Sequence, residues 1–245
     1  MYLAITGRQS NLALAELESL FDSSLITPFG DNAALIDDAR APQLFAQIGS
    51  SIKLAQVFDV TSESQFNPSS WVNQHFMDAV ELTDNRKLNL GVSCYQADQH
   101  YKPLLSALSS KLQEAGKKVR QVPPKHKNRL SSAQVFHNKL DMPRNIELVC
   151  VSNGDKIALA QTVAIQNITA YRVRDRDRPG RDAVVGMLPP KLAQTLINLS
   201  GVSAKATGLT LLDPFCGTGV TLMEAGLMGF TPYGTDISKR MVKYS

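Results

Sequence analysis

The sequence predicts an α+β amino-terminal region that is followed by the first part of an α/β domain. Two observations support this fold class. Before residue 170, short apolar runs of strand length alternate with helical patterns. After residue 208, a strand, a glycine-rich loop, a helix and a second strand follow one another directly, which is typical of a βαβ unit.

The composition is that of a globular protein in a reducing compartment. Of 245 residues, 43% are hydrophobic and 20% are charged, and no apolar run has the length of a membrane span. Residues 1–6 lack the charged, apolar and small-residue order of a signal peptide. The cysteines Cys94, Cys150 and Cys216 are far apart and form no CxxC pattern, so we expect no disulfide framework and no metal site. We therefore expect a cytoplasmic protein without membrane contact.

The charge is unevenly distributed. Residues 1–110 hold 6 Lys and Arg against 12 Asp and Glu, whereas residues 111–245 hold 20 against 10. This asymmetry favours a polyanionic partner for the second half, because cations near phosphates release counterions. The first basic stretch supplies the candidate RNA-binding residues Lys117, Lys118, Arg120, Lys125, Lys127 and Arg129. Acidic residues interrupt a second stretch over 172–182, and a solvated surface explains either stretch equally well.

The amino-terminal elements follow from apolar periodicity. Strands are expected at 2–6, 25–28 and 33–36, with a helix at 11–21. A second group is expected to contain strands at 53–61 and 88–95 and helices at 71–80 and 101–114. Gly116 is the expected left-handed cap of the last helix.

Two local signals organise residues 130–165. Ser131 and Gln134 have the spacing of a capping box, which predicts that a helix begins behind the basic stretch. Strands at 146–152 and 156–165 are expected to form a hairpin, because Asn153-Gly154 supplies the positive φ of a tight turn.

A domain boundary is expected near residue 170. Residues 172–180 are charged and lack periodicity, so we interpret them as a connector. A helix is expected from Pro190 to residue 199, with an apolar stripe of leucines at 192, 196 and 199 and an end at Gly201. The βαβ pattern follows, with a buried strand at 209–212, a helix at 221–228 and a strand at 231–235.

The glycine-rich loop between these strands is the strongest candidate ligand site. Residues 213–219 read Asp-Pro-Phe-Cys-Gly-Thr-Gly, and Asp236 follows the next strand. A dinucleotide fingerprint would need glycine where Leu222 stands, and a P-loop would need a lysine after Gly219. A ligand with an ammonium, a carboxylate and a ribose, such as S-adenosylmethionine, fits the two acids better. A βα turn that binds nothing is the alternative.

The motifs DPFCGTG and YGTDIS resemble the first two cofactor motifs of THUMP-containing tRNA methyltransferases that modify the exocyclic amine of guanosine. Residues 181–182, 186–194 and 197–199 resemble the helix before the first strand in that family, and residues 130–140 resemble the end of its THUMP region. The resemblance implies an α+β amino-terminal THUMP-type region and an incomplete Rossmann-like methyltransferase domain. It divides the chain into an amino-terminal α+β domain (1–52), a THUMP-like RNA-binding domain (53–170) and the start of a Rossmann-like S-adenosylmethionine-binding domain (171–245).

The resemblance also assigns roles to residues. The methionine part of S-adenosylmethionine would contact Asp213, Phe215, Cys216, Gly217, Thr218 and Gly219. Asp236 would hold the ribose, Ile237 would pack near the adenine, and the helix start at Pro190-Lys191 would close over the carboxylate side. Cys216 has no adjacent His or Asp, so we interpret it as lining the loop and not as a nucleophile. The implied partner is tRNA, gripped through its single-stranded acceptor end.

The catalytic tetrapeptide of such enzymes is missing from this sequence. Amine methyltransferases use Asp or Asn followed by Pro-Pro and an aromatic residue, and the two Pro-Pro pairs here, at 123–124 and 189–190, lack both flanking residues. We therefore expect no catalytic residue in this chain, a truncated domain, no methyl transfer by the polypeptide alone and weak cofactor binding. A non-catalytic RNA-binding module and a DNA amine methyltransferase remain as alternatives. The sequence leaves the guanosine, the number of methyl groups and any partner protein open.

Overall fold

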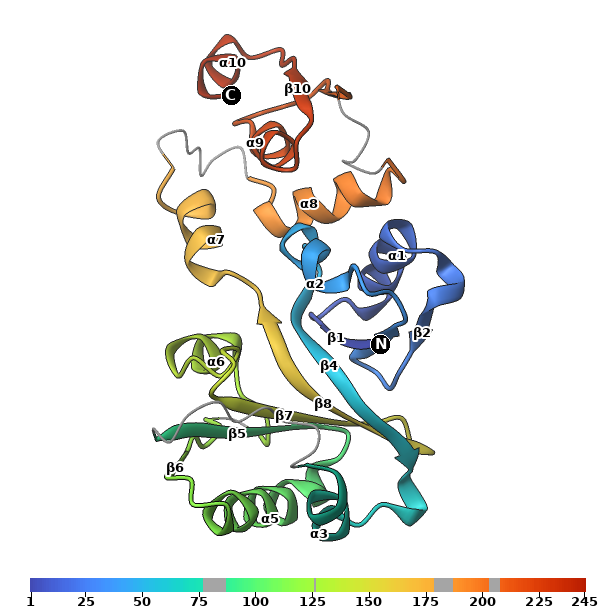
Figure 1. Ribbon diagram of the computed structural model, residues 1–245. Coiled ribbons are helices and arrows are strands. Elements are labelled where there is room, and N and C mark those ends of the chain that lie inside the picture. The colour runs from blue at the N-terminus through green and yellow to red at the C-terminus, as the bar shows by residue number, and fades with distance from the viewer. Residues whose placement is uncertain (77–86, 126, 179–186, 203–207) are drawn as a thin grey trace. The chain divides into compact units, whose positions relative to one another are not determined.

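The computed structural model describes residues 1–76, 87–125, 127–178, 187–202 and 208–245. These residues form two compact units (Figure 1). Unit 1 comprises residues 1–8, 27–42 and 52–166, and unit 2 comprises residues 9–26, 43–51 and 167–245. The units therefore interleave along the amino-terminal part of the chain, whereas the three expected domains are consecutive segments.

Unit 1 is built on an eight-stranded mixed sheet. In spatial order its strands are β2 (Ile26–Pro28), β3 (Ala33–Ile36), β1 (Tyr2–Thr6), β4 (Ser51–Ser62), β8 (Lys156–Ile165), β7 (Ile146–Ser152), β5 (Leu88–Tyr95) and β6 (Val119–Gln121). β5 runs parallel to both β6 and β7, while β7 pairs with β8 as the expected antiparallel hairpin. The hairpin turn has Gly154 at φ +96°, as the Asn-Gly signal predicts.

The two faces of β5 carry different kinds of residue. Leu90, Val92 and Cys94 pack against α5 (Tyr101–Glu114) and its buried leucines at 104, 108 and 112. Because side chains alternate along a strand, Gly91 and Ser93 face the opposite side, where α6 (Ser132–His137) lies (Figure 1). One side of β5 thus faces the larger apolar core, and on the other side the polar Ser93 lies on the face that packs against the smaller apolar cluster of Leu130, Val135 and Leu140.

The helix signals in unit 1 are largely confirmed. α5 ends with Gly116 at φ +77°, and the capping box of Ser131 and Gln134 is present at α6. The helix expected at 71–80 begins earlier, as α3 (Pro68–Trp71), because the Asn67 side chain accepts a hydrogen bond from the Ser70 backbone. It continues as a π-helical turn, η4 (Val72–Phe76), and residues 77–80 lie outside the described part of the chain. Short 3₁₀ turns are η3 (Glu63–Gln65) and η5 (Asp98–His100).

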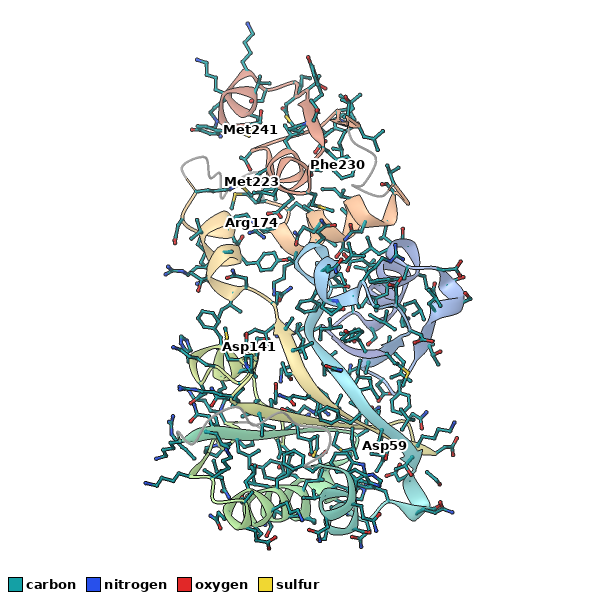
Figure 2. All side chains as sticks on the ribbon, viewed as in Figure 1. Asp59, Asp141, Arg174, Met223, Phe230 and Met241 are labelled. Carbon is teal, nitrogen blue, oxygen red and sulfur yellow. The ribbon has the colours of Figure 1, made fainter. Side chains whose placement is uncertain are left out.

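Unit 2 contains the βαβ element. Its members are α1 (Ser10–Leu20), η1 (Ser23–Leu25), η2 (Phe45–Gln47), α7 (Ile168–Asp175), α8 (Pro190–Leu199), β9 (Thr210–Asp213), α9 (Val220–Leu227), β10 (Thr231–Gly234) and α10 (Lys239–Tyr244), and α2 (Ala41–Leu44) crosses the division. β9 and β10 are parallel, with Gly234 opposite Asp213. Ile197, Ala225 and Phe230 form part of the small core between α8, α9 and the strands (Figure 2).

Three expectations in unit 2 are wrong. Of the connector expected at 172–180, residues 172–175 instead belong to helix α7 (Ile168–Asp175), because the Asn167 side chain caps Ala170 and Tyr171 anchors one face; residues 176–178 lie beyond the helix and residues 179–180 are not described. The leucine stripe of α8 is not its buried face, since Leu196 is 49% exposed while Ala193 and Ile197 are buried. The strand at 209–212 is not buried either, because Leu212 is 62% exposed.

A polar side chain explains why α8 buries a different face from the one that the leucine spacing predicts. Asn198 donates from Nδ2 to Glu16 Oε1 (2.7 Å) and to the Gln47 carbonyl (2.8 Å). The buried Glu16 carboxylate also accepts from the backbone of Gly49 and Ser50, at 2.9 Å each. A fully bonded buried carboxylate thus fixes which side of α8 packs against α1.

Candidate functional site

The glycine-rich loop joins the carboxyl end of β9 to the amino end of α9. The Thr235 backbone, just after β10, donates to the Asp213 carbonyl (3.0 Å) and accepts from the Cys216 N–H (2.9 Å). Gly219 precedes α9 with φ +77°, a conformation that glycine adopts at little cost. The loop is therefore tied to both strands of the parallel pair.

The two acids predicted from the sequence lie at the carboxyl ends of these adjacent strands. Asp236 accepts hydrogen bonds from the backbone of Gly217 (Oδ2, 3.0 Å) and of Ser238 (Oδ1, 2.8 Å). Asp213 accepts from the Phe215 N–H at 3.0 Å. Because each carboxylate oxygen has two acceptor sites, both acids retain capacity for a ligand.

The other predicted cofactor residues divide into two groups. Phe215 is 85% exposed and Ile237 is fully exposed, so both present apolar surface to a ligand. Cys216 and Thr218 are buried within the loop. At Gly217 an added Cβ would meet nothing within 4 Å, which leaves open space above this backbone. The loop thus combines two acids, an open glycine and two exposed apolar side chains, and these features fit the parts of an S-adenosyl nucleoside.

Sequence reasoning missed the contact of Arg178 with this loop. Its guanidinium donates to the Thr218 carbonyl (3.2 Å) and to Thr218 Oγ1, and it also contacts Met187 Sδ at 2.9 Å. The sequence marks Arg178 only as a member of the second basic stretch, with no sign that it contacts the glycine loop. The expected family residues Arg181, Asp182 and Gly186 lie outside the described part of the chain.

A second arginine connects α7 to α9. Arg174 Nε donates to Glu224 Oε1 at 2.7 Å, and its guanidinium lies 4.5 Å from the centre of the Tyr171 ring (Figure 2). Glu224 is fully buried, and burial raises the pKa of its carboxyl although Arg174 opposes the shift. This ion pair therefore links α7 to α9, the helix that follows the glycine loop.

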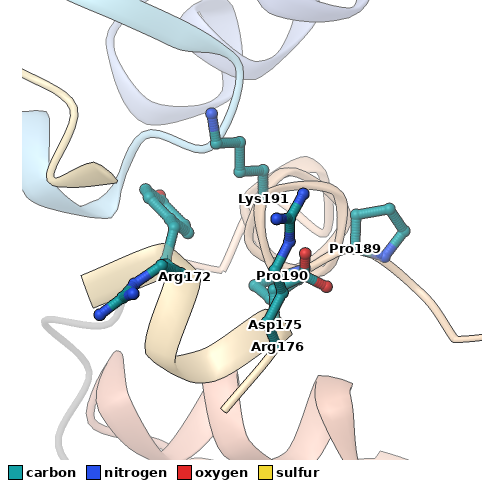
Figure 3. Close-up of a pocket in the computed structure, with 7 residues that line it drawn as sticks. Arg172, Asp175, Arg176, Pro189, Pro190 and Lys191 are labelled. Atoms are coloured by element: carbon teal, nitrogen blue, oxygen red, sulfur yellow. The ribbon is translucent and has the colours of Figure 1, made fainter. Parts of the chain in front are cut away.

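A pocket of about 250 Å³ adjoins the start of α8, where the resemblance places the carboxylate side of the cofactor (Figure 3). It lies between α7 and the Pro189-Pro190-Lys191 segment, and Arg172 and Arg176 are on its α7 wall. Lys191 Nζ lies 5.2 Å from the centre of the Tyr171 ring, and burial lowers the pKa of this amine.

Unit 1 has a larger pocket of about 490 Å³ with a basic lining. We call it the basic pocket; six of its residues are Arg8, Asn32, Tyr95, Lys125, Arg129 and Gln134. Two of the predicted RNA-binding residues, Lys125 and Arg129, belong to it. The other predicted RNA-binding residues do not line it: Lys118, Arg120 and Lys127 are exposed elsewhere on unit 1, and Lys117 is half-buried.

Three residues of the basic pocket were not found by sequence reasoning. Arg8 follows β1 as an isolated cation, Asn32 lies in a turn, and Tyr95 ends β5. Arg129 lies over the Tyr95 ring at 4.7 Å and donates from Nε to the Cys94 carbonyl at 3.2 Å. The sheet brings these distant segments together, and no local pattern marks them.

The described residues 1–76, 87–125, 127–178, 187–202 and 208–245 contain no cluster of three or more His, Cys, Asp or Glu side chains suited to a metal ion. None of the helices within those ranges has the length and apolar character needed to cross a bilayer. The three cysteines are free thiols with buried side chains, and no His or Asp bonds to Cys216 in the described contacts.

Residues 178–243 match the family UPF0020: RMKL-like, methyltransferase domain. The matched segment covers the glycine loop and Asp236. Over these residues, which include the parallel β9–β10 pair, the chain is therefore similar to a methyltransferase domain.

Individual proteins that are similar to the chain have more specific names than this family. The chain is 57% identical over 58 residues (24% of this chain, 16% of the relative) to the tRNA (guanine(10)-N2)-dimethyltransferase of Methanothermobacter thermautotrophicus. It is 39% identical over 90 residues (35% and 25%) to the protein of the same name from Methanocaldococcus jannaschii. A crystal structure of TrmN from Thermus thermophilus has a TM-score of 0.55 at 18% identity, over 99% of this chain and 67% of that one, and so shares its fold. The chain spans a quarter or less of the length of these two curated relatives.

Proposed function

We propose that the chain serves S-adenosylmethionine-dependent methylation of a guanosine exocyclic amine in tRNA, with the cofactor on the loop of unit 2 and the RNA on unit 1. The observation that carries this proposal is the hydrogen bond from the Gly217 backbone to the Asp236 carboxylate. It joins the glycine loop to the acid of the next parallel strand, which is where such folds bind nucleosides. The names of the similar proteins supply the substrate.

Each part of the cofactor has a counterpart in unit 2. Asp236 accepts hydrogen bonds from the ribose hydroxyls through its remaining lone pairs, and Ile237 covers the adenine. Asp213 and the open backbone at Gly217 face the methionine part, whose sulfonium supplies an electrophilic methyl group. Pro190 and Lys191 close over the carboxylate side. The loop residues Phe215, Cys216, Thr218 and Gly219 complete this site.

The basic pocket and its surroundings hold the RNA. Arg8, Lys125 and Arg129 bring three cations to one concave surface, and Tyr95 adds an aromatic ring beside them. Cations fix phosphates, and an aromatic ring offers a stacking platform to an unpaired base. Lys117, Lys118, Arg120 and Lys127 add further cations to the surface of unit 1 outside the pocket. We place this RNA binding in the cytoplasm.

An exocyclic amine needs hydrogen-bond acceptors as its lone pair attacks, and amine methyltransferases supply these from an Asp/Asn-Pro-Pro-aromatic tetrapeptide. The chain contains no such tetrapeptide. We therefore assign cofactor binding and RNA binding to this chain and no proton-accepting role.

The RNA assignment is tested by charge reversal. We expect Lys125→Glu with Lys127→Glu to weaken binding of a labelled tRNA transcript at least about ten-fold at low salt. The salt dependence should also flatten, because each lost phosphate contact on a single strand lowers the slope by about 0.7. The measurement is fluorescence anisotropy over a salt series.

The matched control is Lys102→Glu with Lys156→Glu, which makes the same charge change at exposed positions of unit 1 outside both the basic pocket and the basic stretch 117–129. Equal losses in the two double variants would mean that net charge, and not this surface, governs binding. Displacement of the tRNA by duplex DNA at equal concentration would favour a DNA amine methyltransferase instead.

A further inference from the structure

A charged pair lies completely buried inside unit 1. Lys53 on β4 and Glu147 on β7 both have no exposed surface, and Lys53 Nζ donates to Glu147 Oε1. Burial disfavours the charged amine, but Glu147 and Tyr95 together outweigh this effect, and the pKa of Lys53 lies above its ordinary value. A buried ion pair is weak evidence for stability, because an apolar pair of similar volume often serves as well. Its other contacts indicate what it does.

Two of those contacts, one through Lys53 and one through Ser93, lead to the backbone of the same residue, Leu130. Lys53 Nζ donates to the Leu130 carbonyl at 2.7 Å. The Leu130 N–H donates to Ser93 Oγ at 2.9 Å, and Ser93 Oγ in turn donates to Glu147 Oε1 at 2.6 Å. The ion pair and Ser93 thus satisfy both backbone groups of Leu130.

Leu130 lies between Arg129 and Ser131, and all three line the basic pocket. The neighbouring segment is held in the same way, because the Cys94 N–H donates to the Asn128 carbonyl at 2.7 Å and Arg129 Nε donates to the Cys94 carbonyl. A change in the Leu130 backbone would therefore move the Arg129 guanidinium and the start of α6 together.

We propose that Lys53, Glu147 and Ser93 are positioning residues of the basic pocket, which hold residues 128–131 so that Arg129 meets a nucleic-acid phosphate. This inference rests on the proposed RNA-binding function of that pocket. The three residues touch no RNA themselves. They hold residues 128–131, the part of the pocket wall that would contact RNA. The network that does this gives every buried polar atom of the ion pair a partner.

Two neighbouring hydroxyl groups donate hydrogen bonds to the Glu147 carboxylate, and removing each in turn gives a matched pair of variants. Ser93 Oγ and Thr162 Oγ1 each donate to this carboxylate at 2.6 Å, from positions that are 0% and 1% exposed. Only Ser93 also accepts from Leu130. Ser93→Ala and Thr162→Val therefore each remove one hydroxyl hydrogen bond to Glu147, to Oε1 and Oε2 respectively, but only Ser93→Ala releases the backbone of the pocket wall.

The experiment measures two quantities on the purified chain. We expect Ser93→Ala to weaken binding of a tRNA transcript by about five- to ten-fold and to accelerate hydrogen exchange of the Leu130 amide, because the Leu130 N–H loses its buried acceptor in addition to the bond lost at Glu147. Thr162→Val should stay within about two-fold of the parent in affinity and leave Leu130 exchange unchanged. Circular dichroism during urea unfolding verifies that both variants fold.

Equal effects of the two variants on tRNA affinity would overturn the proposal, and so would faster Leu130 exchange in Ser93→Ala without loss of affinity. If the parent chain binds no tRNA, the proposed RNA-binding function fails first, and the exchange rate of Leu130 still shows whether the network holds this segment.

Discussion

Gly91 packs directly against the Leu130 side chain. It lies on β5, on the face that carries Ser93 and opposite the apolar core. A Cβ at this position would come within 2.4 Å of Leu130 Cδ1 and 3.0 Å of Leu140 Cδ1. Glycine is therefore required by close packing here and not by an unusual backbone angle.

We expect Gly91→Ala to lower the free energy of unfolding by about 1–3 kcal/mol, because the extra methyl group overpacks this contact. The control is Gly226→Ala in α9, where an added Cβ would meet only Pro232 Cγ at 3.9 Å. That substitution should be neutral or stabilise by up to about 1 kcal/mol, as alanine favours a helix. Urea unfolding measures both, and a neutral Gly91→Ala would show that Leu130 is loosely seated.

At the scale of elements, α7 is the clearest difference between sequence and structure. Its residues are charged and lack apolar periodicity, so the sequence indicated a connector. The helix forms because Asn167 caps it, Tyr171 buries one face and Arg174 pairs with the buried Glu224. Two of these three causes are tertiary contacts that no local pattern carries.

Elements with strong local signals were predicted closely. The bounds of β1, β5 and α5 agree with the expected ranges, as do the capping box at Ser131 and the Asn-Gly hairpin. These depend on alternation, capping and turn chemistry within a few residues. The buried face of α8 and the wall of the basic pocket could not be predicted, because Glu16, Arg8 and Tyr95 reach them from distant segments.

The Arg174–Glu224 pair predicts a pH dependence. The pKa of Glu224 is raised by burial, so folding favours its protonated form, and this contribution to stability is lost as pH rises through the folded-state pKa. Arg174 limits the loss by stabilising the carboxylate. We expect Arg174→Met to raise the pKa of Glu224 further and to make stability fall more steeply between about pH 4 and 7.

Urea unfolding at several pH values measures this slope. Glu224→Gln is the companion variant, because it keeps a hydrogen-bond acceptor for Arg174 while it removes the titrating group. Its profile should be flatter than that of the parent. Parallel profiles for the parent and Arg174→Met would contradict the role assigned to the pair.

At the scale of the whole molecule, each unit carries one part of the proposed function. Unit 1 contains the basic pocket and the buried network behind it, and unit 2 contains the glycine loop, Asp236 and the arginines of α7. Within unit 2, residues 178–243 match a methyltransferase domain. The RNA-binding assignment of unit 1 rests on its own geometry and charge.

The cofactor site is tested most directly by titrating the ¹⁵N-labelled chain with S-adenosylhomocysteine and following backbone amides by NMR. We expect saturable shifts at Gly217, Thr218 and Gly219, and their loss in Asp236→Ala, because this carboxylate joins the loop to the ribose position. Absence of shifts at about millimolar ligand, where even a weak site with a binding free energy near −4 kcal/mol is half filled, would contradict the assignment. So would shifts confined to unit 1.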